Sequence, residues 1–263
     1  MQQILIATGL VAAIGLLMGL LLISVDRKFK VEVDKKEIAV REYLPGNNCG
    51  ACGFAGCDAL AAAIVKGEES VSGCPVGGIA VAEKIANIIG VETEEPQKMT
   101  AFVKCSGDCG HVEHRANYVG IHDCASAVAS GLSPWSCDYG CLGFGTCSAV
   151  CPFGAIMVKD GVACVDSQKC RACGKCIAAC PKHLIELIPD QAPYAVRCSN
   201  RDRGPAVKQV CTAGCIGCRI CEKQCEAYAV HVSDNISHID YEKCVGCGAC
   251  AENCPVKVIA KRS

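Results

Sequence analysis

The sequence has few aromatic residues, no excess of charge of either sign and no motif that marks an enzyme active site. Aromatic side chains make up 5% of its 263 residues, and the formal net charge at pH 7 is −1. The scarcity of aromatics argues against one large apolar core, and the balanced charge gives no indication of nucleic-acid binding. We find no glycine-rich phosphate loop, acid–base pair or nucleophile constellation. Covalent chemistry on a bound substrate is therefore not indicated.

Cysteine, by contrast, is abundant: 26 residues, many in runs of the form C-x2-C-x2-C. Secreted disulfide scaffolds can be as rich in cysteine, but they are small, and their cysteines do not usually fall in repeated runs of this kind. Thiols two residues apart bind a metal more readily than they pair with each other. The pattern predicts metal–thiolate sites in a reducing compartment, with the metal supplying part of the folding free energy.

Two of these runs match the bacterial ferredoxin motif C-x2-C-x2-C-x3-C-P, and a third has Glu226 in place of the final proline. In such a motif the first three thiolates bind one [4Fe–4S] cluster and the fourth binds the neighbouring cluster. The runs begin at Cys170, Cys215 and Cys244. Because each motif gives its fourth cysteine to the other, this exchange predicts two carboxyl-terminal sites. One consists of Cys215, Cys218, Cys221 and Cys254, and the other of Cys244, Cys247, Cys250 and Cys225.

The stretch from Cys137 to Pro152 has the same spacing as the motif at Cys170 but lacks one cysteine, because Phe144 stands where the second ligand is expected. Cys137, about one helical turn before Cys141, is the nearest substitute in the sequence. A three-iron cluster, with Phe144 marking the missing ligand, is the alternative. The four-ligand interpretation predicts two further sites, Cys137, Cys141, Cys147 with Cys180, and Cys170, Cys173, Cys176 with Cys151.

A separate group of cysteines nearer the amino terminus predicts another compact site, formed by Cys49, Cys52, Cys57 and Cys74. Glycines beside these residues let backbone amides approach sulfur, which stabilises a reduced cluster. Four thiolates also suit Zn²⁺, but the ferredoxin motifs elsewhere in the chain favour iron and sulfide. A helix is predicted over 58–65, with Asp58 as a candidate cap, and a second over 78–90 packs on this module.

Six cysteines remain outside these groups: Cys105, Cys109, Cys124, Cys164, Cys198 and Cys211. Residues 103–106 and 196–199 have similar sequences, which predicts that two related loops face one site. We assign a sixth cluster to Cys105, Cys109 and Cys124, with Cys198 or Cys211 as the fourth ligand. A ligand from His111, His114 or His122 is the alternative. Cys164 lies in the apolar segment 161–165 and is predicted to be a small buried hydrophobe.

The amino-terminal stretch 4–25 contains no charged residue. A helix of about 22 residues spans roughly 33 Å, enough for the hydrocarbon core of a bilayer. The uncharged start does not resemble a signal peptide. Arg27, Lys28 and Lys30 follow the stretch, which places the rest of the chain in the cytoplasm, at the inner membrane.

We therefore predict an α+β chain with one amino-terminal transmembrane helix, a small four-cysteine [4Fe–4S] module and tandem ferredoxin-like domains. Strand-like segments follow the motifs at 155–158, 184–188, 229–232 and 258–260. The predicted boundaries are 1–26 for the anchor, 27–43 for a linker, 44–91 for the four-cysteine module, 92–100 for a second linker, 101–210 for the first ferredoxin-like domain with its additional cysteines, and 211–263 for the second.

This combination resembles the B subunit of the Rnf complex in its long, polyferredoxin form, and the resemblance covers essentially the whole chain. It implies a subunit of a membrane-bound ferredoxin:NAD⁺ oxidoreductase that pumps Na⁺ or H⁺. The chain itself would be an electron carrier that holds six [4Fe–4S] clusters, or five if the sixth cysteine group binds none. It would take electrons from soluble ferredoxin and pass them to other subunits, among them a flavin-bearing subunit that binds NAD⁺, while its anchor contacts membrane lipid.

Ferredoxins are usually acidic, so a basic surface favours their encounter with a partner. Arg197, Arg201, Arg203 and Lys208 form the strongest candidate for such a surface. Two other classes of function remain open. One is a tethered polyferredoxin that serves a hydrogenase or another reductase, and the other is a zinc-binding assembly protein.

Overall fold

The computed structural model describes residues 12, 14–24, 34–92 and 97–262. Residues 14–24 are helical, but much of the predicted anchor at 4–25 lies outside the described residues, as does part of each predicted linker. Within the described ranges, no helix combines the length and the hydropathy that a membrane crossing requires.

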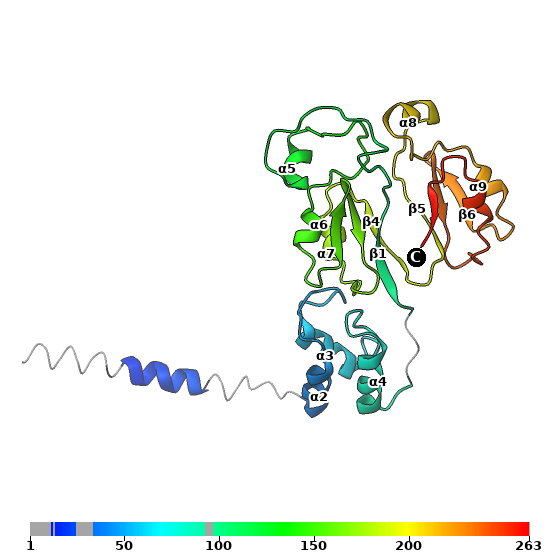
Figure 1. Ribbon diagram of the computed structural model, residues 1–263. Coiled ribbons are helices and arrows are strands. Elements are labelled where there is room, and N and C mark those ends of the chain that lie inside the picture. The colour runs from blue at the N-terminus through cyan, green and yellow to red at the C-terminus, as the bar shows by residue number, and fades with distance from the viewer. Residues whose placement is uncertain (1–11, 13, 25–33, 93–96, 263) are drawn as a thin grey trace, which may run out of the picture.

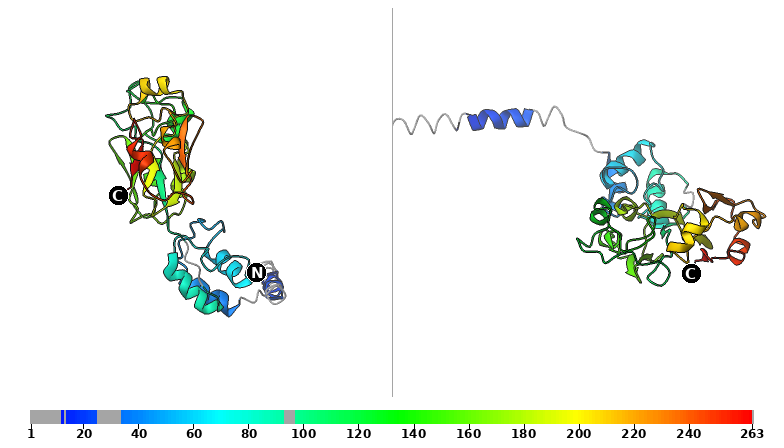
Figure 2. Two further views of the ribbon diagram at one scale, coloured as in Figure 1. Left: turned by 90° about the vertical axis from the view of Figure 1, so that its right-hand side faces the viewer. Right: turned by 90° about the horizontal axis from the view of Figure 1, so that it is seen from above.

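The four-cysteine module is a small helical unit. Its helices are α2 (Lys35–Tyr43), α3 (Cys57–Lys66) and α4 (Gly78–Ile89). Leu60, Ile64 and Ile85 are almost fully buried at their centre, which agrees with the predicted packing of the second helix on the module. In Figure 1 this unit lies below the strands, and the left view of Figure 2 shows it at one end of the molecule.

Asp58 does not cap α3, contrary to the prediction. The helix begins one residue earlier, at Cys57, and Gly56 takes the cap position without a side-chain hydrogen bond. The free amide of Cys57 instead donates to Oδ1 of Asn48 at 2.8 Å. Asp58 points outward and pairs with Arg41 at 2.5 Å. A side chain from the preceding loop therefore satisfies the first turn, and sequence adjacency could not show this.

The remainder of the chain contains two ferredoxin-like units with the same order of elements. In each unit the outer strands pair with one another, and a hairpin lies between them. The first consists of β1 (Met99–Val103), α6 (Thr146–Ala149), β2 (Ile156–Lys159), β3 (Val162–Val165), α7 (Lys175–Ala179) and β4 (Ile185–Pro189). The second consists of β5 (Tyr194–Val196), α9 (Ile220–Lys223), β6 (Val230–Ser233), β7 (Ile236–Ile239), α10 (Ala249–Glu252) and β8 (Ile259–Lys261).

The pairing fixes where the second unit begins. β1 pairs with β4 from Met99 opposite Pro189 to Val103 opposite Ile185. β5 pairs with β8 in the same antiparallel sense, with Val196 opposite Ile259. Because β5 belongs to the sheet of the second unit, that unit starts near residue 194, and the predicted boundary after residue 210 falls inside it. The strands predicted after each motif all form, within one residue.

The connection that follows the first outer strand of each unit is long and carries a short helix. After β1 it contains α5 (Cys124–Ala129), and after β5 it contains α8 (Gly204–Val210). Figure 1 shows both connections at the end of the molecule farthest from the helical module, with the two ferredoxin-like units side by side beneath them. An isolated bridge between Val112 and Cys211 ties the two connections together.

Candidate iron–sulfur sites

All 26 cysteines lie within the described residues, and each is a free thiol. No group of three or more His, Cys, Asp or Glu side chains in the described part of the chain converges closely enough to hold a single ion. In two places four thiols instead surround a small cavity, as expected of a donor set for a multi-atom cluster.

Four of the predicted ligand groups keep most of their members together. In the first unit, the pKa of Cys176 is raised to about 11 by burial and by the neighbouring Cys170 and Cys173. In the second unit, burial raises the pKa of Cys221, to which Cys215 and Cys218 also contribute. Burial likewise raises the pKa of Cys250 to about 11, with contributions from Cys244 and Cys225. In the helical module, Cys57 and Cys52 add to the burial that raises the pKa of Cys74.

The structure groups the remaining thiols differently from the sequence interpretation. One cavity is lined by Cys124, Cys141, Cys147 and Cys180, which we call the loop site. Burial raises the pKa of Cys147 to about 12, with Cys141, Cys124 and Cys180 as the contributing thiols. Cys124 therefore takes the place that the sequence interpretation gave to Cys137.

Phe144, which replaces the expected second ligand, helps to hold the segment that carries Cys124. Its ring packs on Tyr118 and His122, with ring centroids 4.8 and 5.1 Å away. The amide of Cys124 donates to Oγ1 of Thr146 at 2.9 Å. The loop before α5 is thereby fixed against the start of α6, beside Cys147, and a fourth thiol is supplied from outside the motif.

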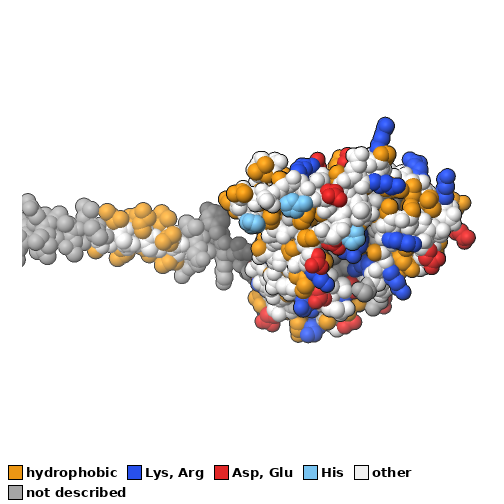
Figure 3. Space-filling view, turned by 45° about the horizontal axis from the view of Figure 1, so that its top comes forward, with side chains coloured by type: hydrophobic (Ala, Val, Ile, Leu, Met, Phe, Trp, Pro, Cys, Tyr) orange, Lys and Arg blue, Asp and Glu red, His pale blue; other side chains and the backbone are white. Residues whose placement is uncertain are grey.

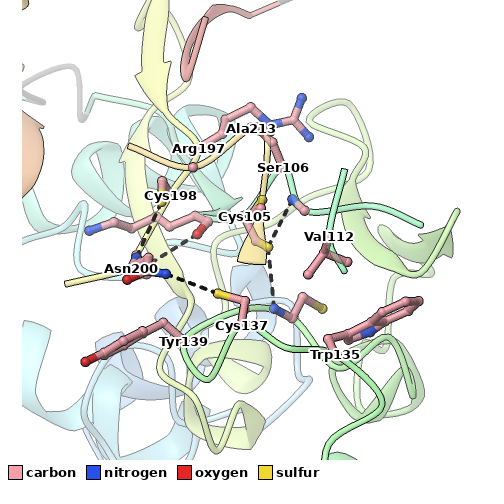
Figure 4. A pocket seen from close by; sticks show the side chains of 17 residues that line it. Cys105, Ser106, Val112, Trp135, Cys137, Tyr139, Arg197, Cys198, Asn200 and Ala213 are labelled. Carbon is pink, nitrogen blue, oxygen red and sulfur yellow. Dashed lines mark hydrogen bonds between the residues drawn. The ribbon is translucent and has the colours of Figure 1, made fainter. Parts of the chain in front are cut away.

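A second cavity is lined by Cys105, Cys137, Cys198 and Cys211, which we call the bridging site. Cys105 and Cys137 come from the first unit and the other two from the segment that opens the second (Figure 4). The similar segments 103–106 and 196–199 both contribute to its wall, so the two related loops do face one site. Cys105 is buried, which raises the pKa of its thiol to about 12.

The residues around the bridging site fit a cluster. A Cβ atom at Gly107 would lie 3.5 Å from Sγ of Cys211 and 3.7 Å from Sγ of Cys105, inside the space between the thiols. Backbone amides of Gly107 and Cys141 donate to Sγ of Cys105, both at 3.4 Å. Nε1 of Trp135, which lines the cavity, is buried without an acceptor among the described residues. Cluster sulfides would supply acceptors there.

Two cysteines are left outside every group. Cys109 is exposed, and Cys164 is half-buried on β3, with its thiol near the carbonyl of Val162. Neither lines the bridging or the loop cavity. The prediction for Cys109 as a ligand of the sixth site therefore has no support in the geometry. His111 bonds Asp108 at 2.7 Å, and His114 and His122 pack on aromatic rings.

Neighbouring sites share walls or hydrogen bonds along the molecule. Cys74 of the helical module and Cys170 of the first unit line one cavity. Cys141 of the loop site also lines the bridging cavity. Sγ of Cys198 in the bridging site accepts a hydrogen bond at 3.3 Å from the amide of Cys215, the first ligand of the next group. Within each ferredoxin-like unit, the cysteines of the two motifs share one core cluster. The thiol groups thus form one continuous row.

Comparisons with protein families agree with this division of the chain. Residues 44–76 match the family described as a putative Fe–S cluster, and residues 134–190 match a 4Fe–4S dicluster domain. Residues 212–228 and 237–260 each match a 4Fe–4S binding domain. Cys105, Cys109, Cys124, Cys198 and Cys211 fall outside all four matches. The fold and the thiol groups define a multicluster iron–sulfur protein built around two ferredoxin-like units.

Comparison with three curated relatives identifies the family within this class of iron–sulfur proteins. The chain is 42% identical to the B subunit of the Na⁺-translocating ferredoxin:NAD⁺ oxidoreductase complex of Acetobacterium woodii, over 99% of this chain and 78% of the relative. It is also 42% identical to the B subunit of the ion-translocating oxidoreductase complex of Methanosarcina acetivorans, over the full length of both. The B subunit of the proton-translocating ferredoxin:NAD⁺ oxidoreductase complex of Clostridium ljungdahlii is 38% identical over 93% of this chain and 87% of its own. The chain belongs to the family of B subunits of ion-translocating (Rnf) oxidoreductase complexes.

Proposed function

We propose that this chain is the electron-relay subunit of a membrane-bound, ion-translocating ferredoxin:NAD⁺ oxidoreductase. The observation that carries the proposal is the continuous row of thiol groups from the helical module to the carboxyl-terminal unit. A [4Fe–4S] cluster takes up and releases one electron, and its potential depends on burial and on hydrogen bonds to sulfur. The protein's part is to place the ligands, exclude water and supply those hydrogen bonds.

We assign six ligand sets, four retained from the sequence interpretation and two revised because four thiols line one cavity in each case. The retained sets are Cys49, Cys52, Cys57, Cys74; Cys151, Cys170, Cys173, Cys176; Cys215, Cys218, Cys221, Cys254; and Cys225, Cys244, Cys247, Cys250. The revised sets are the loop site and the bridging site. In this partition the bridging site links the two ferredoxin-like units, so electrons cross between the units there. Cys109 and Cys164 bind no cluster.

Soluble ferredoxin is the proposed electron donor, and the other subunits of the complex receive the electrons. Arg201, Arg203 and Lys208 are exposed and make no ion pair to a described carboxylate. Figure 3 shows one face of the molecule, on which Lys and Arg side chains gather at the right, over the second ferredoxin-like unit. Arg197 is half-buried and lines the bridging cavity. We therefore leave it out of the proposed docking surface.

An anchor in the inner membrane, with the iron–sulfur region on the cytoplasmic side, completes the proposal. The described helical residues 14–24 support it, because Leu16, Leu17 and Leu22 expose about two thirds of their surface. A run of exposed leucines on a helix is a surface that lipid or a partner helix normally covers.

The direct functional test is electron uptake. The anaerobically purified chain is mixed with reduced ferredoxin, and cluster reduction is followed by absorbance and electron paramagnetic resonance (EPR). Rapid reduction of several interacting [4Fe–4S] signals supports the relay. A chain that holds zinc in place of iron would overturn it. Co-purification with nicotinamide-reducing subunits, rather than with a hydrogenase, separates this function from that of a general tethered polyferredoxin.

A further inference from the structure

Asn200 is an unusual residue at the bridging site, because its polar side chain is almost completely buried. Only 2% of its surface is exposed, and the other buried polar side chains among the described residues are Thr100 and Ser237. A buried amide without partners is costly, so its hydrogen bonds explain why it is tolerated there.

The hydrogen bonds of Asn200 fix the direction of its side chain. Oδ1 accepts from the amide of Asp202 at 2.7 Å, which identifies the oxygen end of the amide. Nδ2 then donates to Sγ of Cys137 at 3.5 Å. The backbone amide of the same residue donates to Sγ of Cys198 at 3.4 Å (Figure 4). One residue thus contacts a ligand from each ferredoxin-like unit.

Most other hydrogen bonds to the thiols come from the backbone. Examples are Ala101 to Cys170, Ala155 to Cys151, Leu184 to Cys180 and Ala229 to Cys225, at 3.3 to 3.4 Å. Apart from Asn200, the one side chain in the described part of the chain that bonds a cysteine sulfur is Ser237, 3.3 Å from Cys221. A substitution cannot readily remove a backbone donor, whereas it can remove the amide of Asn200 or the hydroxyl of Ser237. That hydroxyl accepts from the Cys221 thiol and can donate to the same sulfur when it is a cluster-bound thiolate.

We propose that Asn200 is a positioning residue that raises the reduction potential of the cluster at the bridging site. The inference rests on the proposed function and on the ligand set of that site. An N–H group directed at a ligand sulfur stabilises the additional negative charge of the reduced cluster more than the oxidised one. At the bridging site, this makes the link between the two units easier to reduce than its four thiolates alone would.

The test is a redox titration, followed by EPR, of the full chain and two variants. Asn200→Leu removes the donor at similar volume. Asn200→Asp keeps an oxygen for the amide of Asp202 but turns a carboxylate oxygen toward Cys137. In both variants we expect one reduction step to move to a more negative potential, further in Asn200→Asp, with iron and acid-labile sulfide at wild-type values.

Ser237→Ala is the matched control, because it removes the other side-chain contact from a cluster in the second unit. It should shift a different step and leave the Asn200 step in place. In a chain that lacks the bridging site through Cys105→Ala and Cys137→Ala, Asn200→Leu should move none of the remaining steps.

The proposal fails if neither variant shifts a potential, or if Asn200→Leu produces the same shift in the chain that lacks the bridging site. Loss of four irons in both variants would also contradict it, because Asn200 would then serve assembly and not potential. A wild-type chain without iron and sulfide would instead defeat the proposed function itself.

Discussion

The amide of Cys124 and the hydroxyl of Thr146 are joined by a hydrogen bond of 2.9 Å across 22 residues of sequence. The same hydroxyl donates to Oδ1 of Asp123 at 2.8 Å, and Asp123 caps α5 by accepting from the amide of Ser126. Thr146 is the first residue of α6, next to Cys147. This contact brings a distant thiol into the cavity beside a ferredoxin motif that lacks its second cysteine.

Thr146→Val should therefore disturb the loop site selectively. The substitution removes both hydrogen bonds of the hydroxyl, at a cost of roughly 1–2 kcal/mol, and frees the segment that carries Cys124. Iron per chain should fall from about 24 toward about 20, since each cluster holds four irons. Iron and sulfide analysis of the anaerobically purified variant measures this loss.

Ser130→Ala provides the control for that experiment. Oγ of Ser130 donates to the carbonyl of Ala127 at 2.9 Å, near the carboxyl end of α5, the helix that begins at Cys124. It does not line the loop cavity. Its removal should leave the iron content unchanged. Full iron content in Thr146→Val as well would mean that Cys124 is held by other contacts or is not a ligand.

The proposed ferredoxin surface predicts a charge-reversal effect. Changing Arg201, Arg203 and Lys208 together to Glu should slow oxidation of reduced ferredoxin by at least about tenfold at low salt, because steering by opposite charge is lost. The rate should also depend less on ionic strength than in the wild type. Stopped-flow measurements at several salt concentrations give both quantities.

A matched triple variant on the helical module separates docking from net charge. Lys35, Lys66 and Lys84 are exposed there, and changing them to Glu alters the total charge equally. Its rate and salt dependence should stay near those of the wild type. Equal slowing in both triple variants would show that long-range charge alone matters and would remove the assigned surface.

His238 predicts a dependence of stability on pH. Its ring on β7 stacks on His231 of β6, with centroids 5.3 Å apart. Burial lowers the pKa of His238, and the nearby Lys104 and His231 add to this effect. The folded state thus binds the proton less readily than the unfolded state, where the pKa is about 6.5. The free energy of unfolding should therefore be highest above that pH and fall as the pH drops below it. It should level off below the pKa of His238 in the folded state.

His238→Gln should flatten that profile between about pH 7 and pH 5, because the glutamine does not titrate in this range. The midpoint of anaerobic thermal unfolding, measured at several pH values, reports it. His183→Asn is the control, since His183 is exposed and its loss should leave the profile unchanged. An identical profile in His238→Gln would assign the pH dependence to other groups.

The sequence was sufficient to predict the elements that local pattern determines. The helices of the module and the strands after each motif are encoded within short stretches, and the structure has both in place. The exchange of the fourth cysteine between neighbouring motifs stays a prediction. The similarity of residues 103–106 and 196–199 also predicted that the two loops face one site. They follow β1 and β5, which are equivalent strands of the two units.

The ligand sets of the loop and bridging sites could not be predicted in the same way. Cys137 is close to Cys141 in the sequence, but the turn between them directs it toward Cys105 and Cys198. The segment that carries Cys124 is held at the loop site by the bond from Cys124 to Thr146 and by the packing of His122 on Phe144, which no local periodicity encodes. Long-range packing therefore decides which thiols share a site, and Phe144 was the signal in the sequence that another ligand had to come from elsewhere.

The most direct test of the account is the iron content of paired cysteine variants. If Cys105 and Cys137 bind the same cluster, Cys105→Ala, Cys137→Ala and the double variant should each hold about 20 irons, whereas Cys105→Ala with Cys124→Ala should hold about 16. Cys109→Ser and Cys164→Ser should keep about 24. The opposite result, about 16 irons without Cys105 and Cys137 and about 20 without Cys105 and Cys124, would restore the sequence partition and contradict a bridging site between the two units.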